Sequence, residues 1–130
     1  MAEILIVEDD APARAVLRDT VELAGYRVRE ASDGERALRA LDDAAVDLVI
    51  IDLFMPRKEG LETIREVRKK FGALPVIAIS GGGNRGQLEY LSIAEHFGAD
   101  VVLAKPFTRS ALVEAIEALL AQNPEDAELS

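Results

Sequence analysis

Polar side chains directly follow four apolar runs of this sequence, where an unpaired buried charge would be costly. They are Glu8, Asp9 and Asp10 after ILIV, Asp52 after LVII, Ser80 after VIAI, and Lys105 after VVLA. Carboxylates that converge repel one another, and a hard divalent cation relieves the repulsion. Mg²⁺ takes oxygen ligands and keeps several waters, whereas these positions offer no soft ligand for zinc. The acidic positions therefore indicate a magnesium site.

The other two positions extend this chemistry to a phosphoryl group. Lys105 is a compact cation that can pair with Asp52 and then with a phosphoryl oxygen, and Ser80 can donate its hydroxyl to the same oxygen. With Asp52 as nucleophile, these groups can move a phosphoryl group onto an aspartate. Each residue alone also fits a solvated strand end, but that explanation is much weaker for four strand ends together.

Five short runs are predicted to be the β-strands that carry these residues. They are EILIV (Glu3–Val7), RVREA (Arg27–Ala31), DLVII (Asp47–Ile51), PVIAI (Pro75–Ile79) and DVVLA (Asp100–Ala104). All but the second are apolar on consecutive residues, which is typical of strands buried on both faces of a parallel sheet. RVREA alternates, which predicts an edge strand.

Helical patterns lie between and after the strands. Gly25, Gly72 and Gly98 are predicted to end three of these helices, a short helix is expected over 35–41, and Thr108 is a predicted N-cap of the last. The alternation predicts an open parallel sheet with helices on both faces. Such sheets bind ligands beyond the carboxyl ends of the strands, which is where all the polar positions fall.

Composition excludes several classes of protein. The 130 residues fit one domain, and a net charge of −9 disfavours nucleic-acid binding. No apolar run approaches the ~20 residues of a membrane span, no signal peptide opens the chain, and no cysteine is present. We therefore expect a cytoplasmic protein that contacts neither membrane nor nucleic acid, with a polar acidic tail over 122–130.

The motifs ILIVEDD, IIDLFMPRKEG, AIS and AKPF, in this order and spacing, resemble those of two-component response-regulator receiver domains. The resemblance covers the chain up to residue 121 and is to the stand-alone, chemotaxis-receiver-like kind. It implies a (βα)5 fold, a doubly wound five-stranded parallel sheet with the flavodoxin-like strand order 2-1-3-4-5. It also implies a bacterial signalling domain that at most catalyses its own phosphorylation and dephosphorylation.

The resemblance assigns a metal site as well. Asp52 matches the phosphoacceptor, and Asp9, Asp52 and the backbone carbonyl of Phe54 match the ligands of Mg²⁺. Glu8 matches an acid that acts largely through water, and Asp10 is an extra acid that many members carry.

A second set of matching residues would bind the phosphoryl group and switch the domain. Ser80 matches the switch hydroxyl, the amide of Gly81 is expected to hold phosphoryl oxygens, and Lys105 matches the lysine of the family. The resemblance implies a cis bond before Pro106. The family often has an aromatic residue where this chain has Val102, so signal output is expected to take another route.

In the mechanism that the resemblance implies, a histidine kinase or phosphotransfer protein presents a phosphohistidine, which Asp52 attacks. The acyl phosphate then draws Ser80 inward and changes the last helix–strand–helix face, which meets a downstream protein target. Because nothing after Ser130 supplies an output domain, we expect a single-domain regulator, a monomer or weak dimer.

Two other functions are open to such a sequence. One is a phosphorylation-independent interaction module of the same fold. The absence of an aromatic residue at Val102 leaves this function open. The other is a Mg²⁺-dependent hydrolase with an aspartyl nucleophile, which Phe54 disfavours because those enzymes usually carry a second aspartate there. His96 and the basic run Arg65–Lys70 are interpreted as solvated surface.

Overall fold

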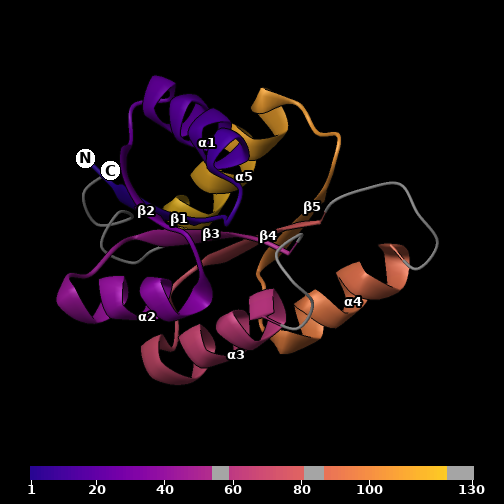
Figure 1. Cartoon of the computed structure of the whole chain (residues 1–130). Helices are drawn as coiled ribbons and strands as arrows, with labels where there is room; N and C mark the ends of the chain where they lie inside the picture. Colours follow the sequence, from indigo (N-terminus) through magenta and orange to yellow (C-terminus); the bar gives the residue numbers. More distant parts are fainter. Residues whose placement is uncertain (54–58, 81–86, 123–130) are drawn as a thin grey trace.

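A parallel sheet between two layers of helices forms the structure, a computed structural model that describes residues 1–53, 59–80 and 87–122 (Figure 1). The strands are β1 (Glu3–Val7), β2 (Arg27–Ala31), β3 (Leu48–Asp52), β4 (Val76–Ser80) and β5 (Val101–Ala104). The helices are α1 (Ala11–Leu23), α2 (Gly34–Asp43), α3 (Glu59–Phe71), α4 (Gln87–Phe97) and α5 (Arg109–Ala121).

The sheet order is β2-β1-β3-β4-β5 with every pair parallel, which confirms the predicted fold class. RVREA is an edge strand, as its alternation predicts. The prediction that the fifth strand is buried on both faces is wrong. Strand β5 forms the other edge, and each of its residues is half-buried. Its side chains pack against both cores, Val102 on one side and Val101 and Leu103 on the other, but they stay half-buried because no strand lies beyond β5.

Alternate residues of the strands supply two separate hydrophobic cores. Ile4, Ile6, Ile50 and Ile79 face α1 and α5, where they pack with residues such as Leu112. The intervening strand residues face the other helical layer, α2, α3 and α4. Since β1, β3 and β4 are buried on both faces, their only route to solvent is through their ends.

The helix boundaries follow capping chemistry. Thr108 caps α5, as predicted, with its side chain accepting from the amide of Ala111 at 3.0 Å. The predicted C-terminal glycines Gly25, Gly72 and Gly98 all have positive φ, a conformation that favours glycine. Helix α2 is longer than the expected 35–41, because Asp33 caps it and its helical turns continue past the last apolar residue.

Candidate functional site

The strand register brings the predicted residues to one edge of the sheet. In the pairing of β1 with β3, Val7 lies opposite Ile51, so that Glu8 and Asp52 are next to each other at the carboxyl ends. The amide of Lys105 donates to the carbonyl of Ser80 at 2.9 Å, which places β5's end beside that of β4. Asp52 and Ser80 are the last residues of their strands and not, as predicted, the first residues beyond them.

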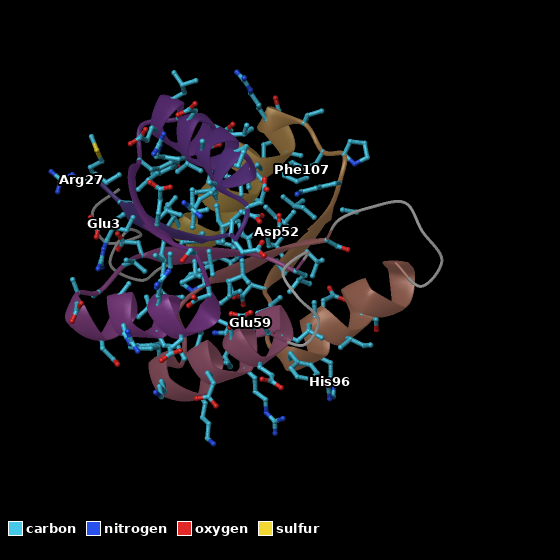
Figure 2. The ribbon with its side chains drawn as sticks, viewed as in Figure 1. Glu3, Arg27, Asp52, Glu59, His96 and Phe107 are labelled. Carbon is cyan, nitrogen blue, oxygen red and sulfur yellow. The ribbon has the colours of Figure 1, made fainter. Side chains whose placement is uncertain are left out.

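Asp52 is fully buried and forms an ion pair with Lys105. The lysine ammonium lies 2.9 Å from Oδ2 of Asp52, and 37% of the lysine side chain is exposed. Figure 2 shows Asp52 near the middle of the molecule, between the two helical layers. A buried carboxylate is tolerated when a cation and hydrogen bonds compensate it. The lysine therefore compensates the charge of the carboxylate from the open side of the site.

Glu8 is the second buried acid of this edge, only 2% exposed. Its Oε1 accepts from the amide of Asp10 at 3.0 Å, whereas Oε2 has no hydrogen-bond partner among the described residues. Burial, followed by the neighbouring Asp52 carboxyl, raises the pKa of Glu8 to about 8, against the lowering effect of the Asp10 amide. Among the described residues, this edge thus holds more acid than the ammonium of Lys105 neutralises, a condition that favours a bound cation.

The other two acids of the segment differ in role. Asp9 is exposed, and its carboxyl adds a small contribution to the raised pKa of Glu8. Asp10 is the N-cap of α1, and its Oδ2 accepts from the amide of Ala13 at 2.9 Å. The extra acid is therefore part of the helix start, a role that its position before Pro12 could have indicated from sequence.

The residues present fit Mg²⁺ by their chemistry. Glu8, Asp9 and Asp52 offer oxygen ligands alone, and one buried oxygen of Glu8 has no hydrogen-bond partner among the residues that the structure describes. In the described part of the chain no three histidine or acidic side chains are already grouped around one point as ligands. The predicted backbone ligand at Phe54 and the phosphoryl-binding amide of Gly81 lie outside the described residues.

The remaining predicted residues lie close to this edge. Ser80 is 4% exposed at the end of β4. The Lys105–Pro106 peptide bond is cis. Val102 lies opposite Ala78 in the sheet and packs, half-buried, against the core on the α2–α4 side.

Two residues have contacts that sequence reasoning missed. Arg14 donates to the carbonyl of Glu8 at 2.8 Å, and nothing in the sequence relates it to that carbonyl beyond its place one turn into α1. Arg68, interpreted from the sequence as solvated, is half-buried and reaches the carboxylate of Asp100 at 2.8 Å. His96 is exposed, as predicted.

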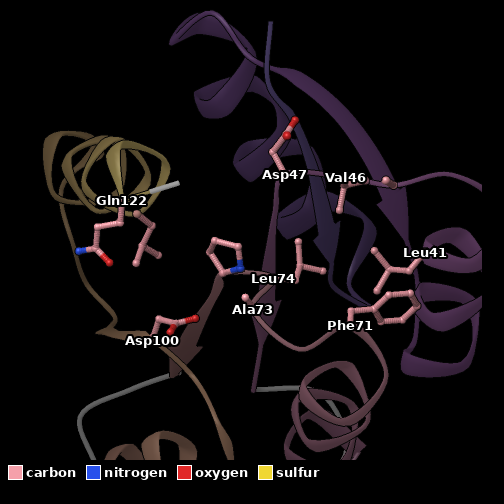
Figure 3. Close-up of a pocket in the computed structure, with 11 residues that line it drawn as sticks. Leu41, Val46, Asp47, Phe71, Ala73, Leu74, Asp100 and Gln122 are labelled. Carbon is pink, nitrogen blue, oxygen red and sulfur yellow. The ribbon is translucent and has the colours of Figure 1, made fainter. Parts of the chain in front are cut away.

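Two pockets differ in their relation to the site. One, of about 720 Å³, lies between α1 and the segment after β5, and it is lined by Ala13, Val16, Leu17, Thr20, Lys105, Pro106, Phe107, Arg109 and Leu112. It adjoins the site through Lys105. The other, of about 490 Å³, is shown in Figure 3. It lies at the opposite edge of the sheet, near Asp47 and Asp100, and contains none of the predicted site residues.

Comparison with known proteins agrees with this geometry. The family described as "Response regulator receiver domain" matches residues 4–117, so the chain belongs to the receiver domains of two-component response regulators. These are phosphoacceptor signalling domains and not conventional enzymes. The family generally binds Mg²⁺ and generally has a histidine kinase as partner.

Three relatives illustrate the similarity. The transcriptional regulatory protein CpxR of Klebsiella pneumoniae is 38% identical over 120 residues, which are 92% of this chain and 50% of that protein. The receiver domain of NtrX from Brucella abortus has 32% identity and a TM-score of 0.84, over 92% of this chain and 99% of that one. The chemotaxis protein CheY4 of Vibrio cholerae has 29% identity and a TM-score of 0.81, over 92% and 98%. The chain spans about half the length of the curated relatives that it matches.

None of the helices in the described ranges is long and apolar enough to cross a membrane.

Proposed function

We propose that this chain is a phosphorylatable regulator in which Asp52 accepts a phosphoryl group from the phosphohistidine of a histidine kinase or phosphotransfer protein. The observation that carries the proposal is the fully buried carboxylate of Asp52, 2.9 Å from the ammonium of Lys105 and one strand away from Glu8, whose Oε2 has no hydrogen-bond partner in the described ranges. A nucleophile, a cation and spare acidic ligands thus meet at one strand edge.

The reaction that follows is a displacement at phosphorus. A carboxylate oxygen of Asp52 bonds to phosphorus while the bond from phosphorus to the histidine nitrogen breaks, and the imidazole keeps the electron pair. Lys105 moves from the carboxylate to a phosphoryl oxygen, and the hydroxyl of Ser80 donates to another. Mg²⁺, held by Asp9 and Asp52 with Glu8 acting through water, would neutralise the charge of the phosphoryl oxygens.

Switching follows from the burial of Ser80. Ser80 as a whole is 4% exposed at the end of β4, so movement of its side chain toward a phosphoryl group changes the packing of its neighbours. A phosphoryl group shifts a conformational equilibrium only by contacting the two states differently, and Ser80 and Lys105 supply that difference. The changed surface would then bind a downstream protein.

In the first experiment the chain is incubated with a small acyl phosphate and Mg²⁺, and the mass of the intact protein is measured by mass spectrometry. We expect wild type to gain one phosphoryl group and Asp52→Asn to gain none. Asp19→Asn, a change of the same kind at an exposed acid of α1, is the control and should react like wild type. A wild type that gains nothing, or an Asp52→Asn that gains as much, would overturn the proposal.

The pocket beside Lys105 is a suitable docking place for the phosphodonor protein. Its walls on α1 and after β5 are mostly apolar, it is continuous with the site, and Val16 in it is 64% exposed. Val16→Glu should slow transfer from the donor protein while leaving reaction with the small acyl phosphate unchanged. Leu23→Glu is the control, since Leu23 is a 77% exposed residue of the same helix that does not line the pocket.

The interaction module that needs no phosphorylation is the second candidate, favoured by the absence of an aromatic ring at Val102. The affinity for a target protein, measured with the phosphorylated and unphosphorylated chain, separates the two. Equal affinities would favour the module.

A further inference from the structure

Arg14 joins the acidic segment after β1 to the edge strand β2. Its Nη1 donates to the backbone carbonyl of Glu8 at 2.8 Å, and its Nε donates to Oε1 of Glu30 at 3.0 Å. The side chain as a whole is 21% exposed, so most of it is shielded from solvent. Its planar fork has fixed donor directions, so the two contacts together define its orientation.

The partner of Arg14 is itself held in place. Oε2 of Glu30 accepts from Nη1 of Arg18 at 3.0 Å, and these two arginines lie one turn apart on α1. Glu30 is thus bound through both oxygens, which leaves little freedom for the guanidinium of Arg14. Of the two arginines, Arg14 donates to the acidic segment, whereas Arg18 donates to Glu30.

The carbonyl that Arg14 binds belongs to the peptide unit between Glu8 and Asp9. That unit is planar, so a fixed carbonyl of Glu8 also fixes the amide and the Cα of Asp9. The preceding amide, that of Glu8, is fixed separately by donation to the carbonyl of Ala31 at 3.1 Å. Without Arg14, this peptide unit would lose the hydrogen bond to its own carbonyl and would be held only through the flanking amides of Glu8 and Asp10.

We propose that Arg14 is a positioning residue that orients the Glu8–Asp9 peptide, and through it the carboxylates of the metal site. The link from Arg14 to Mg²⁺ rests on the proposed function, whereas its link to the peptide rests on its hydrogen bonds alone. Residues that orient metal ligands from outside typically change metal affinity 10–100-fold when removed.

The test compares Arg14→Ala with Arg18→Ala. Both variants remove one arginine from Glu30, but only the first removes the donor to the carbonyl of Glu8. In the metal-free chain, we expect Arg14→Ala to shift the amide NMR signals of Asp9 and Asp10 and to speed their hydrogen exchange. Arg18→Ala should leave both amides near their wild-type positions. Equal behaviour of the two variants at these amides would overturn the inference.

Titration with Mg²⁺ by calorimetry gives the second readout. Arg14→Ala should bind Mg²⁺ at least about tenfold more weakly, and Arg18→Ala within about twofold of wild type, because it removes only a half-exposed ion pair. Arg14→Lys keeps the charge and one donor, so its Mg²⁺ affinity should lie between those of the other two variants. This variant also tests the inference if Arg14→Ala does not fold. Wild-type affinity in both Arg14 variants would overturn the inference.

Failure of the proposed function gives a different result. A wild-type chain that binds no Mg²⁺ and accepts no phosphoryl group would overturn the function, and with it the metal half of this inference. The amide signals of the metal-free variants would still decide whether Arg14 positions the peptide.

Discussion

The ammonium of Lys105 lies 2.9 Å from the carboxylate of Asp52, and the two side chains differ sharply in exposure: none of Asp52 and 37% of Lys105 are accessible. The lysine therefore reaches from solvent to a charge that has no access to water of its own. The cation therefore lies on the side from which another anion can approach, whereas the carboxylate is enclosed at the end of β3.

Replacing Lys105 with methionine should destabilise the metal-free chain, because the buried charge of Asp52 loses its cation. Solvent screens the exposed lysine, so we expect about 1–2 kcal/mol, less than the ~3–5 kcal/mol of a fully buried pair. Urea unfolding without metal measures the change. Lys69→Met, on the exposed side of α3, should be nearly neutral, and an equal effect of the two variants would contradict the pairing.

The raised pKa of Glu8 predicts a pH dependence of stability. Because burial and the Asp52 carboxyl raise this pKa from 4.5 to about 8, the folded metal-free chain holds a proton that the unfolded chain releases. The stability from this group is fully present below pH 4.5 and is lost as the pH rises through about 8, at roughly 1.4 kcal/mol per pH unit in between. Glu8→Gln should flatten this slope. Unfolding curves of both proteins in chelator from pH 5 to 9 measure it, and parallel curves would refute the prediction.

Adding Mg²⁺ should stabilise the chain more at alkaline than at acidic pH. The metal competes with the proton of Glu8, whose pKa is about 8, and ligands must be deprotonated to attract it. The midpoint of thermal unfolding with and without Mg²⁺, at pH 6.5 and 8.5, tests this. Removal of the metal with chelator should reverse the gain. Asp9→Asn should lose most of the gain, and a gain independent of pH would show that Glu8 does not participate.

Much of this fold and site could be predicted because the sequence places its unusual residues at strand ends. The five runs and their caps predict the parallel sheet, and parallel strands bring their carboxyl ends to one edge. That is why Asp52 and Lys105, 53 positions apart in the chain, could be predicted to meet.

Contacts made by long side chains across the fold could not be predicted in this way. The solvated interpretation of Arg68 is wrong because the end of α3 lies beside the segment between α4 and β5, which the periodicity of α3 does not reveal. The half-burial of β5 could not be predicted for a related reason, since an apolar run does not show whether a further strand lies beside it.

Arg68 predicts a localised stability effect. Its guanidinium donates to the carbonyls of Gly72, Leu74 and Gly98 and pairs with Asp100, so that one side chain joins α3 to the segment between α4 and β5. Arg68→Ala should lower the free energy of unfolding by about 2–3 kcal/mol, since several partly buried acceptors lose their donor. Arg65→Ala, an exposed arginine of the same helix, is the control. Similar losses in both variants would mean that these contacts contribute little.

The contact between α2 and α3 leaves no room for a side chain at Gly34. A Cβ built there would lie 2.0 Å from Oγ1 of Thr63, a hydroxyl that donates to the carbonyl of Glu59 at 2.7 Å. The amide of Gly34 also donates to Oε1 of Glu59 at 2.9 Å, so α2 cannot shift away without losing this bond. We expect Gly34→Ala to destabilise the chain by about 1–3 kcal/mol.

A double-mutant cycle with Thr63→Ala isolates this clash. Thr63→Ala removes the hydroxyl nearest to the added Cβ, although it also gives up the bond to the carbonyl of Glu59. The double variant should therefore be less destabilised in urea than the sum of the two single variants, by about 1 kcal/mol or more. If the two losses simply add, the cost at Gly34 arises from its own backbone and not from the packing of α2 on α3.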